Sequence, residues 1–387
     1  MSELRTRTTQ HGRQMEILHT PMGVRDTYGR EYAEKQEIIR AISRRMHLYG
    51  YQALQTPTFE FFDVFSKEIG TKPSRELYKF FDKEGNTLVL RPDFTPSVAR
   101  VAARYFSDEK QPLRFCYEGS AFSNHTSDLQ GRLRETCQIG AELMNDGSVY
   151  ADAEMIALLI DALRASGLSD FQISIGNVEY FKGLCREASL TPEDESELRD
   201  AISGKNYFAA EDLLKSRGYG RDVRDSFRLF SNFLQDEDQL VELREQTGNS
   251  RSRDAVDRMI ALHRILTQYG MQQYLSYDLS LLSRYNYYTG IIFKAYTYGT
   301  GEPVAAGGRY DGLLSYFGKD APAVGSMIAV DPLLDALRRQ GIHVPVPDAP
   351  EEIRYTPATY AQALEKASAM RAAGRAVVLL PAQEQAP

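Results

Sequence analysis

Hydrophobic positions recur at helical spacing in several parts of the chain. The first such run places four apolar or aromatic residues on one face: Ile39, Ile42, Met46 and Tyr49. Gly50 follows this run, so the pattern predicts a helix that ends there. Residues 148–166 predict a second helix, whose apolar centre is typical of a buried element. Residues 189–270 have a helical pattern throughout, and residues 332–340 predict one more helix.

Shorter stretches alternate between apolar and polar residues, which is the period of a strand. The predicted strands are residues 51–55, 77–82, 87–90, 113–122, 133–144, 171–176, 277–282 and 290–298. Residues 83–86 read Lys-Glu-Gly-Asn, a turn signal that predicts a hairpin between the second and third strands. Helices and strands in this order indicate an α+β protein.

The same pattern divides the chain into four parts. Residues 1–18 are polar without an apolar period, and we expect them to be disordered. Residues 19–340 form the core, with an all-helical insertion at about 189–270. Residues 341–351 are a stiff Pro-rich linker, and residues 352–387 form a short C-terminal β-α-β remnant.

Composition and charge exclude several classes of protein. The 387 residues include 46 Lys and Arg against 53 Asp and Glu, a net charge of −7, which argues against tRNA or DNA as the main partner. No apolar run is long enough for a membrane helix. The three cysteines have no metal-site spacing, so we expect no metal and a cytoplasmic location. No nucleotide-binding or other cofactor motif occurs, and we expect no cofactor.

The strand over residues 133–144 carries the most informative polar face. Alternation places Gln138, Gly140 and Glu142 on one side of the sheet, with apolar residues on the other. An amide and a carboxylate on either side of a glycine are suited to binding an ammonium group, as an amino-acid site requires. The alternative is an ordinary solvent-facing strand, which the pattern alone favours.

Two further features have both a functional and a structural interpretation. The aromatic cluster around Tyr287 and Tyr288 offers flat walls for a heteroaromatic ring, although a chain with 23 tyrosines produces such clusters by chance. Gly307 and Gly308 would let the backbone approach a ligand closely, but such a pair is most often a turn. His263 lies on an apolar helix face, which favours a packed histidine over a ligand.

These segments together resemble the catalytic core of histidyl-tRNA synthetase and of its paralogue, the regulatory subunit of ATP phosphoribosyltransferase. The matching motifs are residues 21–26, 56–60 (motif 1 of the family), 90–96, 138–142, 287–288 and 307–311. The resemblance extends over about residues 21–337. It implies a class II aminoacyl-tRNA synthetase-like antiparallel sheet flanked by helices, with the helical insertion in its expected place.

The resemblance also implies a histidine-binding site. Asp93 and Thr95 match residues near the α-amino group, and Gln138 and Glu142 match its acceptors. Tyr287 and Tyr288 match the aromatic side of the imidazole pocket. Nearby cations that could contact an anion or a carboxylate are Arg132, Arg134 and Arg309.

The adenylation machinery of the family does not carry over. The two ATP-binding arginines correspond to Ser123 and Pro332, and the arginine that polarises the substrate carboxylate corresponds to Ser283, with Arg284 one place away. A charged contact to phosphate contributes roughly 1.5–3 kcal/mol, so losing several would abolish adenylation. We therefore expect a catalytically inactive chain.

The family resemblance then implies a regulatory role. The expected partners are the short-form catalytic subunit of ATP phosphoribosyltransferase, a second copy of this chain bound through the motif 1 region, and L-histidine as effector. The chain would activate the first step of histidine biosynthesis and carry its feedback inhibition, without binding tRNA. The alternatives are a divergent histidyl-tRNA synthetase and an orphan histidine sensor with another partner.

Overall fold

The computed structural model describes residues 18–65, 73–124, 133–283 and 287–382. The chain divides into two compact units, residues 1–344 and 345–387, and each unit is described by itself below. The N-terminal segment predicted to be disordered lies almost entirely outside the described residues. No helix within the described ranges is long and apolar enough to cross a membrane.

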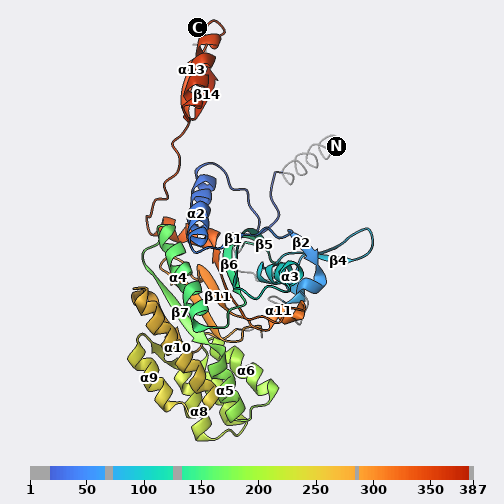
Figure 1. Cartoon of the computed structure of the whole chain (residues 1–387), viewed down its shortest axis with the longest axis vertical. Coiled ribbons are helices and arrows are strands. Elements are labelled where there is room, and N and C mark those ends of the chain that lie inside the picture. Colours follow the sequence, from blue (N-terminus) through green and yellow to red (C-terminus); the bar gives the residue numbers. More distant parts are fainter. Residues whose placement is uncertain (1–17, 66–72, 125–132, 284–286, 383–387) are drawn as a thin grey trace, which may run out of the picture. The chain divides into compact units, whose positions relative to one another are not determined.

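A nine-stranded sheet forms the centre of the first unit (Figure 1). Its strands, in spatial order, are β1 (Gln52–Ala53), β5 (Leu113–Phe122), β6 (Glu135–Met144), β12 (Ala323–Ala329), β11 (Ala305–Arg309), β10 (Ile291–Thr297), β7 (Phe171–Asn177), β9 (Leu275–Asp278) and β8 (Phe233–Leu234). The sheet is mixed rather than purely antiparallel, because β1 pairs with β5 and β7 pairs with β9 in parallel. The remaining neighbours, including all those beneath the site described below, are antiparallel.

Helices α2 (Gly29–Leu48), α4 (Val149–Ala165) and α12 (Val330–Arg339) pack together against one face of this sheet. The predicted apolar face of α2 is confirmed at Ile39, Ile42 and Met46, which are at most 8% exposed. Helix α4 begins at Ser148, whose hydroxyl accepts a hydrogen bond from the Ala151 amide. These helices and the sheet enclose the main hydrophobic core.

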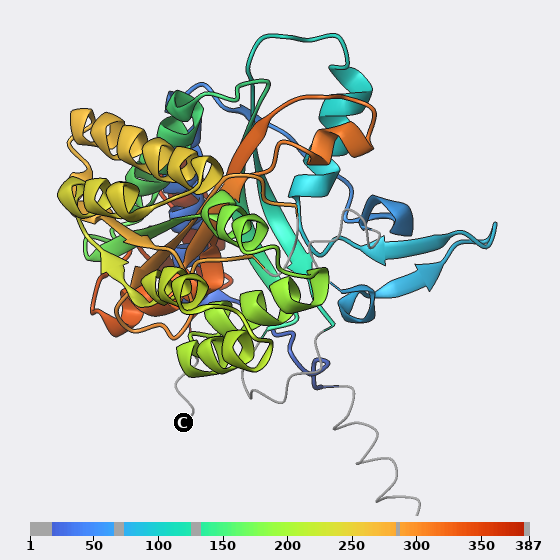
Figure 2. The same cartoon turned by 90° about the horizontal axis from the view of Figure 1, so that it is seen from below.

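The opposite side of the sheet carries α3 (Thr95–Tyr105) and α11 (Leu313–Tyr316). Beside α3 lies a small antiparallel sheet made of β2 (Phe59–Phe61), β4 (Thr87–Leu90) and β3 (Lys79–Phe81), visible in blue at one side of Figure 2. The predicted hairpin is confirmed between β3 and β4, where Phe81 pairs with Thr87. The Asp82 carboxylate fixes the turn by accepting a hydrogen bond from the Asn86 amide at 2.8 Å. Short 3₁₀ turns cover Phe62–Phe65 and Ser74–Glu76.

The segment predicted to be purely helical contains one strand. Its helices are α6 (Pro192–Ser203), α7 (Tyr207–Ser216), α8 (Arg221–Arg228), α9 (Glu237–Gln246) and α10 (Ser250–Gln268), with a 3₁₀ turn at Leu229–Ser231; α5 (Val178–Glu187) precedes the segment, and a 3₁₀ turn at Gln272–Tyr274 follows it. Between them, β8 adds an edge strand to the main sheet, which corrects the helix-only prediction. Its two residues are too few to show a period, so only the long-range pairing with β9 defines it.

The second unit is a single β-α-β element. Strands β13 (Glu351–Tyr355) and β14 (Val377–Pro381) pair in parallel, and α13 (Tyr360–Ala372) connects them. Ala363 and Ala367 of the helix are buried against the strand pair. This order of elements is the usual way to join two parallel strands.

Candidate functional site

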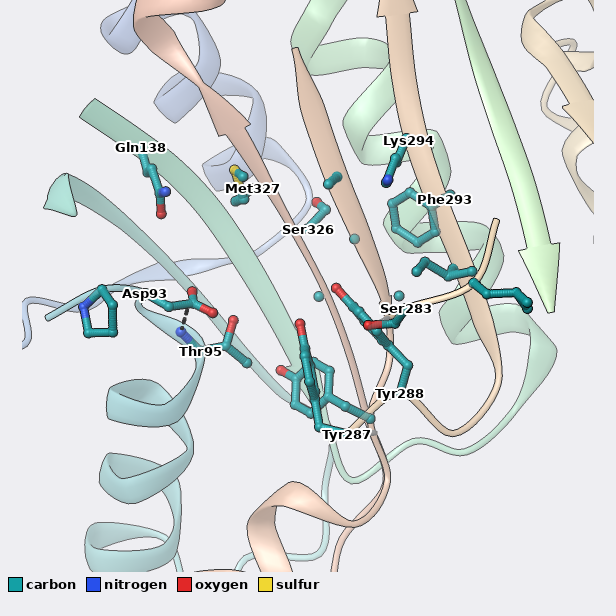
Figure 3. Close-up of a pocket in the computed structure, with 18 of the residues that line it drawn as sticks. Asp93, Thr95, Gln138, Ser283, Tyr287, Tyr288, Phe293, Lys294, Ser326 and Met327 are labelled. Carbon is teal, nitrogen blue, oxygen red and sulfur yellow. Dashed lines mark hydrogen bonds between the residues drawn. The ribbon is translucent and has the colours of Figure 1, made fainter. Parts of the chain in front are cut away.

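A cavity of about 560 Å³ opens on the α3 side of the main sheet (Figure 3). Strands β6, β12, β11 and β10 form its floor, and the N-terminus of α3 borders one side. Ser203 of α6 also contributes to the wall, so the helical segment helps to enclose it. Five of the six predicted histidine-site residues line this space: Asp93, Thr95, Gln138, Tyr287 and Tyr288. The sixth, Glu142, lies beneath them.

The predicted alternation along β6 is confirmed, but the solvent-facing interpretation of its polar face is wrong. Gln138 is 9% exposed and Glu142 is 1% exposed. Gln138 borders the cavity, and Gly140 leaves room for the Tyr117 ring from the neighbouring strand. The sequence could not distinguish the two interpretations, because the elements that cover this face are distant along the chain.

The carboxyl group of Glu142 is the centre of a buried hydrogen-bond network. Thr95 donates its hydroxyl to Oε1 at 2.7 Å, Tyr117 donates to the same oxygen at 3.4 Å, and Tyr310 donates to Oε2. Burial nevertheless raises the pKa of Glu142 to about 8, since desolvation outweighs these hydrogen bonds. Both oxygens of Glu142 therefore contact protein hydroxyls. Sequence analysis instead expected this carboxylate to accept hydrogen bonds directly from the ammonium group of a ligand.

Two residues that line the cavity carry acceptor oxygens, Asp93 in the loop before α3 and Gln138 of β6. Asp93 lines the cavity and accepts a hydrogen bond from the Thr95 amide at 3.3 Å. The Gln138 Oε1 atom is fully buried and has no hydrogen-bond partner among the described residues. A buried carbonyl oxygen without a partner costs about 1–3 kcal/mol, so a donor from a ligand would relieve that cost. The arrangement can bind an ammonium group.

Tyr287 and Tyr288 form an aromatic wall, as predicted. Their ring centroids lie 4.1 Å apart, and the Tyr287 ring also approaches that of Tyr310 at 6.2 Å. Burial raises the pKa of both phenols well above its ordinary value, so they stay neutral hydrogen-bonding groups. Flat, neutral rings with polar tips suit a heteroaromatic ligand.

Gly307 and Gly308 do not form the predicted turn, because both lie inside strand β11. A Cβ atom on Gly308 would lie 2.6 Å from the Tyr288 ring, and one on Gly307 would lie 2.5 Å from the Phe293 ring. Gly325 of β12, which sequence analysis did not single out, has the same role, since its Cβ would overlap the Glu142 carboxylate. These glycines let large side chains lie flat on the cavity floor.

Of the three arginines suggested as anion contacts, the two that the structure describes, Arg309 and Arg134, do not line the cavity. Arg309 is 2% exposed and forms ion pairs with Asp152 at 2.7 Å and Asp311 at 2.9 Å, so its charge is already neutralised. Arg134 does not line the cavity and packs over Gly23, whose carbonyl accepts a hydrogen bond from the Arg134 amide. Arg132 lies outside the described residues.

Lys294 of β10 is the one cationic side chain among the described residues that line the cavity. Sequence analysis missed it, although it follows Ile292 at strand spacing within an otherwise apolar segment. A lysine in the middle of a central strand is the signal that could have identified it, because such positions are usually apolar.

Only one of the three positions at which the family has an arginine and this chain does not borders the cavity. Ser283 borders the cavity, whereas Ser123, at the end of β5, and Pro332, in the first turn of α12, do not line it. Ser283 lies in a loop, and the strand predicted over residues 277–282 is observed over Leu275–Asp278 as β9. Arg284 falls outside the described residues. Within the described ranges, no cluster of side chains could hold a metal ion.

Comparison with known proteins agrees with this fold. The family model of histidyl-tRNA synthetase matches residues 23–333. An ATP phosphoribosyltransferase regulatory subunit from Ruminiclostridium cellulolyticum is 37% identical, over 92% of this chain and 84% of the relative. One from Acetivibrio thermocellus is 36% identical, over 93% of this chain and 86% of the relative.

Solved structures give the same result. A protein from Bacillus halodurans, described as an ATP phosphoribosyltransferase regulatory subunit/histidyl-tRNA synthetase, superposes with a TM-score of 0.85 at 32% identity, covering 94% of this chain and 93% of the other. Histidyl-tRNA synthetase from Nostoc has a TM-score of 0.79 at 20% identity, covering 95% and 87%, and shares the fold. The chain therefore belongs to the ATP phosphoribosyltransferase regulatory subunit family, which has the histidyl-tRNA synthetase-like class II fold.

Proposed function

We propose that this chain is the non-catalytic regulatory subunit of ATP phosphoribosyltransferase. It binds the short-form catalytic subunit, activates the first step of histidine biosynthesis, and conveys feedback inhibition by L-histidine. The names of its relatives support the partnership. The observation that carries the histidine assignment is the cavity, where Asp93 and the unpartnered Gln138 Oε1 lie beside an aromatic wall.

In this proposal, Asp93, Thr95 and Gln138 bind the α-amino group, and Tyr287 and Tyr288 flank the imidazole. Glu142 holds Thr95 and Tyr310 in place through its hydrogen bonds and so acts as a positioning residue. Histidine bound here regulates the complex only by favouring one of its states over another. The insertion offers a route for that signal, because Ser203 borders the cavity and Lys205 pairs with Asp278 of β9 at 2.8 Å.

The absence of catalysis by this chain is supported by the loss of cationic residues. The positions for two ATP-binding arginines hold Ser123 and Pro332, and no arginine lines the cavity within the described residues. A polyphosphate requires several cationic contacts, and a single lysine does not provide them.

The decisive experiment measures phosphoribosyl-ATP formation by the source organism's short-form catalytic subunit, with and without this chain. Activity that requires the chain and falls on addition of L-histidine is the expected result. Activation that histidine does not change would refute the feedback role but keep the partnership. No activation of a verified native partner would refute the proposal.

The two alternatives have their own readouts. A divergent histidyl-tRNA synthetase would catalyse histidine-dependent exchange between ATP and pyrophosphate, and we expect none. An orphan sensor would bind histidine without activating the catalytic subunit. The net charge of −7 supports the view that tRNA is not a partner.

A dimer through the motif 1 region is also part of the proposal. The small sheet that contains this region exposes three phenylalanines on one face: Phe59 at 52%, Phe61 at 56% and Phe80 at 37%. Adjacent exposed aromatic side chains are typical of an interaction surface. Glu60, between the first two, is held inward by Arg100 at 2.7 Å, so the strand presents its apolar residues outward.

A further inference from the structure

Lys294 occupies the side of the cavity opposite the ammonium acceptors. Figure 3 shows Asp93, Thr95 and Gln138 on one side, with Lys294 and Ser283 on the other. Strand register explains this separation, because Gly140 of β6 pairs with Met327, Met327 with Ala306, and Ala306 with Lys294. The lysine therefore projects from the same face of the sheet as the acceptors, three strands away.

The Lys294 ammonium has no ion pair with any described residue. Asp278 is the carboxylate that raises its pKa, but that group already pairs with Lys205 at 2.8 Å and accepts the Ser280 amide at 2.9 Å. Desolvation outweighs this influence and lowers the pKa of Lys294. A partly buried cation without a counterion is an anion-binding group whose partner is missing.

We propose that Lys294 binds the α-carboxylate of the amino-acid effector, in place of the arginine that the family has at the position of Ser283. This inference rests on the proposed function of the cavity and deepens it. The floor strands β6 and β10 are separated by three strand spacings, roughly 14 Å. Lys294 and Gln138 both line the cavity above these strands, so a zwitterion with a hydrogen bond of about 2.9 Å at each end is the kind of ligand that would bridge them.

The charge balance of the cavity favours a carboxylate over a phosphate. Among the described lining residues, Asp93 is the one anion and Lys294 is the one cation. A zwitterionic amino acid presents one charge of each sign and matches this pair. A nucleotide phosphate would bring two or more negative charges against a single ammonium and next to Asp93.

The test compares two ligands that differ only at the carboxylate. L-Histidine and L-histidinol share the amino group and the imidazole, but histidinol carries a hydroxymethyl group instead of the carboxylate. Their affinities are measured by titration calorimetry for the full-length wild type, Lys294→Met and Lys294→Arg. Lys215→Met is the matched control, because Lys215 is an exposed residue of α7 that does not line the cavity.

We expect Lys294→Met to weaken histidine binding at least tenfold and to change histidinol binding less than twofold. Lys294→Arg should recover part of the loss, and Lys215→Met should behave as wild type. Equal losses for both ligands would indicate a merely structural lysine, and unchanged histidine affinity would place the carboxylate elsewhere. Either result would overturn the inference while the proposed histidine site stands. No histidine binding by the wild type would overturn both.

Discussion

Glu142 is the residue whose chemistry depends most strongly on its surroundings. Its pKa rises from an ordinary 4.5 to about 8 on burial, so the folded protein holds this proton more tightly than the unfolded chain. Wild-type stability should therefore fall as the pH rises from about 4.5 to about 8, because only the unfolded chain ionises in this window. Each pKa unit corresponds to about 1.4 kcal/mol, so the loss amounts to several kcal/mol at most.

The Glu142→Gln variant should lose this pH dependence, since its side chain does not ionise. Urea unfolding between pH 5 and pH 8 measures the slope. Glu135→Gln, an exposed position on the same strand, is the control and should keep the wild-type slope. A Glu142→Gln protein that loses stability with pH as steeply as wild type would contradict the assignment.

Gly325 leads to a prediction about packing at a single residue. A Cβ atom there would overlap the Glu142 carboxylate and lie 3.1 Å from the Ala141 carbonyl. Gly325→Ala should lower the free energy of unfolding by about 1–3 kcal/mol, because the carboxyl must move out of its network. Gly312→Ala is the control, since its Cβ has no atom within 4 Å and its φ is −91°. Equal stability of the two variants, measured by urea unfolding, would refute this prediction.

At the scale of elements, the sequence predicts best where a local pattern decides the structure. Strand β5 has the predicted bounds of 113–122, and α4 differs from its predicted bounds by one residue at each end. The errors occur where distant pairing decides. Gly307 and Gly308 have the local signature of a turn, yet β10 and β12 hold them in a central strand. Strand β8 likewise exists only through its pairing with β9.

The small sheet allows a prediction about assembly. If Phe59 and Phe61 bury their exposed rings against a second copy, then serine at both positions should convert a dimer into a monomer, since burying one such ring contributes about 1.5–3 kcal/mol. Sedimentation velocity measures the change. Phe208→Ser in α7, where the ring is 84% exposed, is the control and should leave the dimer intact. A monomeric wild type, or a double variant that stays dimeric, would contradict the proposed interface.

At the scale of the whole molecule, the candidate site was predictable only through family resemblance. The patterns at Gln138 and at Tyr287 also had ordinary structural explanations, and nothing local reveals that β6 and a loop about 150 residues later meet over one cavity. Lys294 shows that family resemblance can also miss a residue of the site. Resemblance directed attention to arginines at familiar positions, whereas Arg309 is neutralised by Asp152 and the cation that lines the cavity comes from another strand.

Ligand binding at the cavity should also stabilise the entire first unit. A substitution at Gln138 can separate the stability of the empty protein from the stabilisation that the ligand adds. A ligand that binds only the folded state adds about 2.7 kcal/mol at a concentration 100-fold above its Kd, so L-histidine should raise the Tm of the wild type. In the empty protein, the Gln138 Oε1 atom is buried without a partner among the described residues. Gln138→Leu should therefore leave the Tm of the empty protein unchanged or higher, because it removes an unsatisfied polar group.

The same substitution should remove most of the shift that histidine causes, because the ligand loses an acceptor for its ammonium group. The empty variant should thus be at least as stable as the wild type, whereas its Tm shift with histidine should be smaller. A substitution that only destabilised the fold would lower the Tm of the empty protein instead. Scanning calorimetry with increasing L-histidine measures both. Gln268→Leu, at the exposed last residue of α10, is the control and should keep the full shift. A Gln138→Leu protein with a lower initial Tm and an undiminished shift would mean that Gln138 supports the fold rather than the ligand.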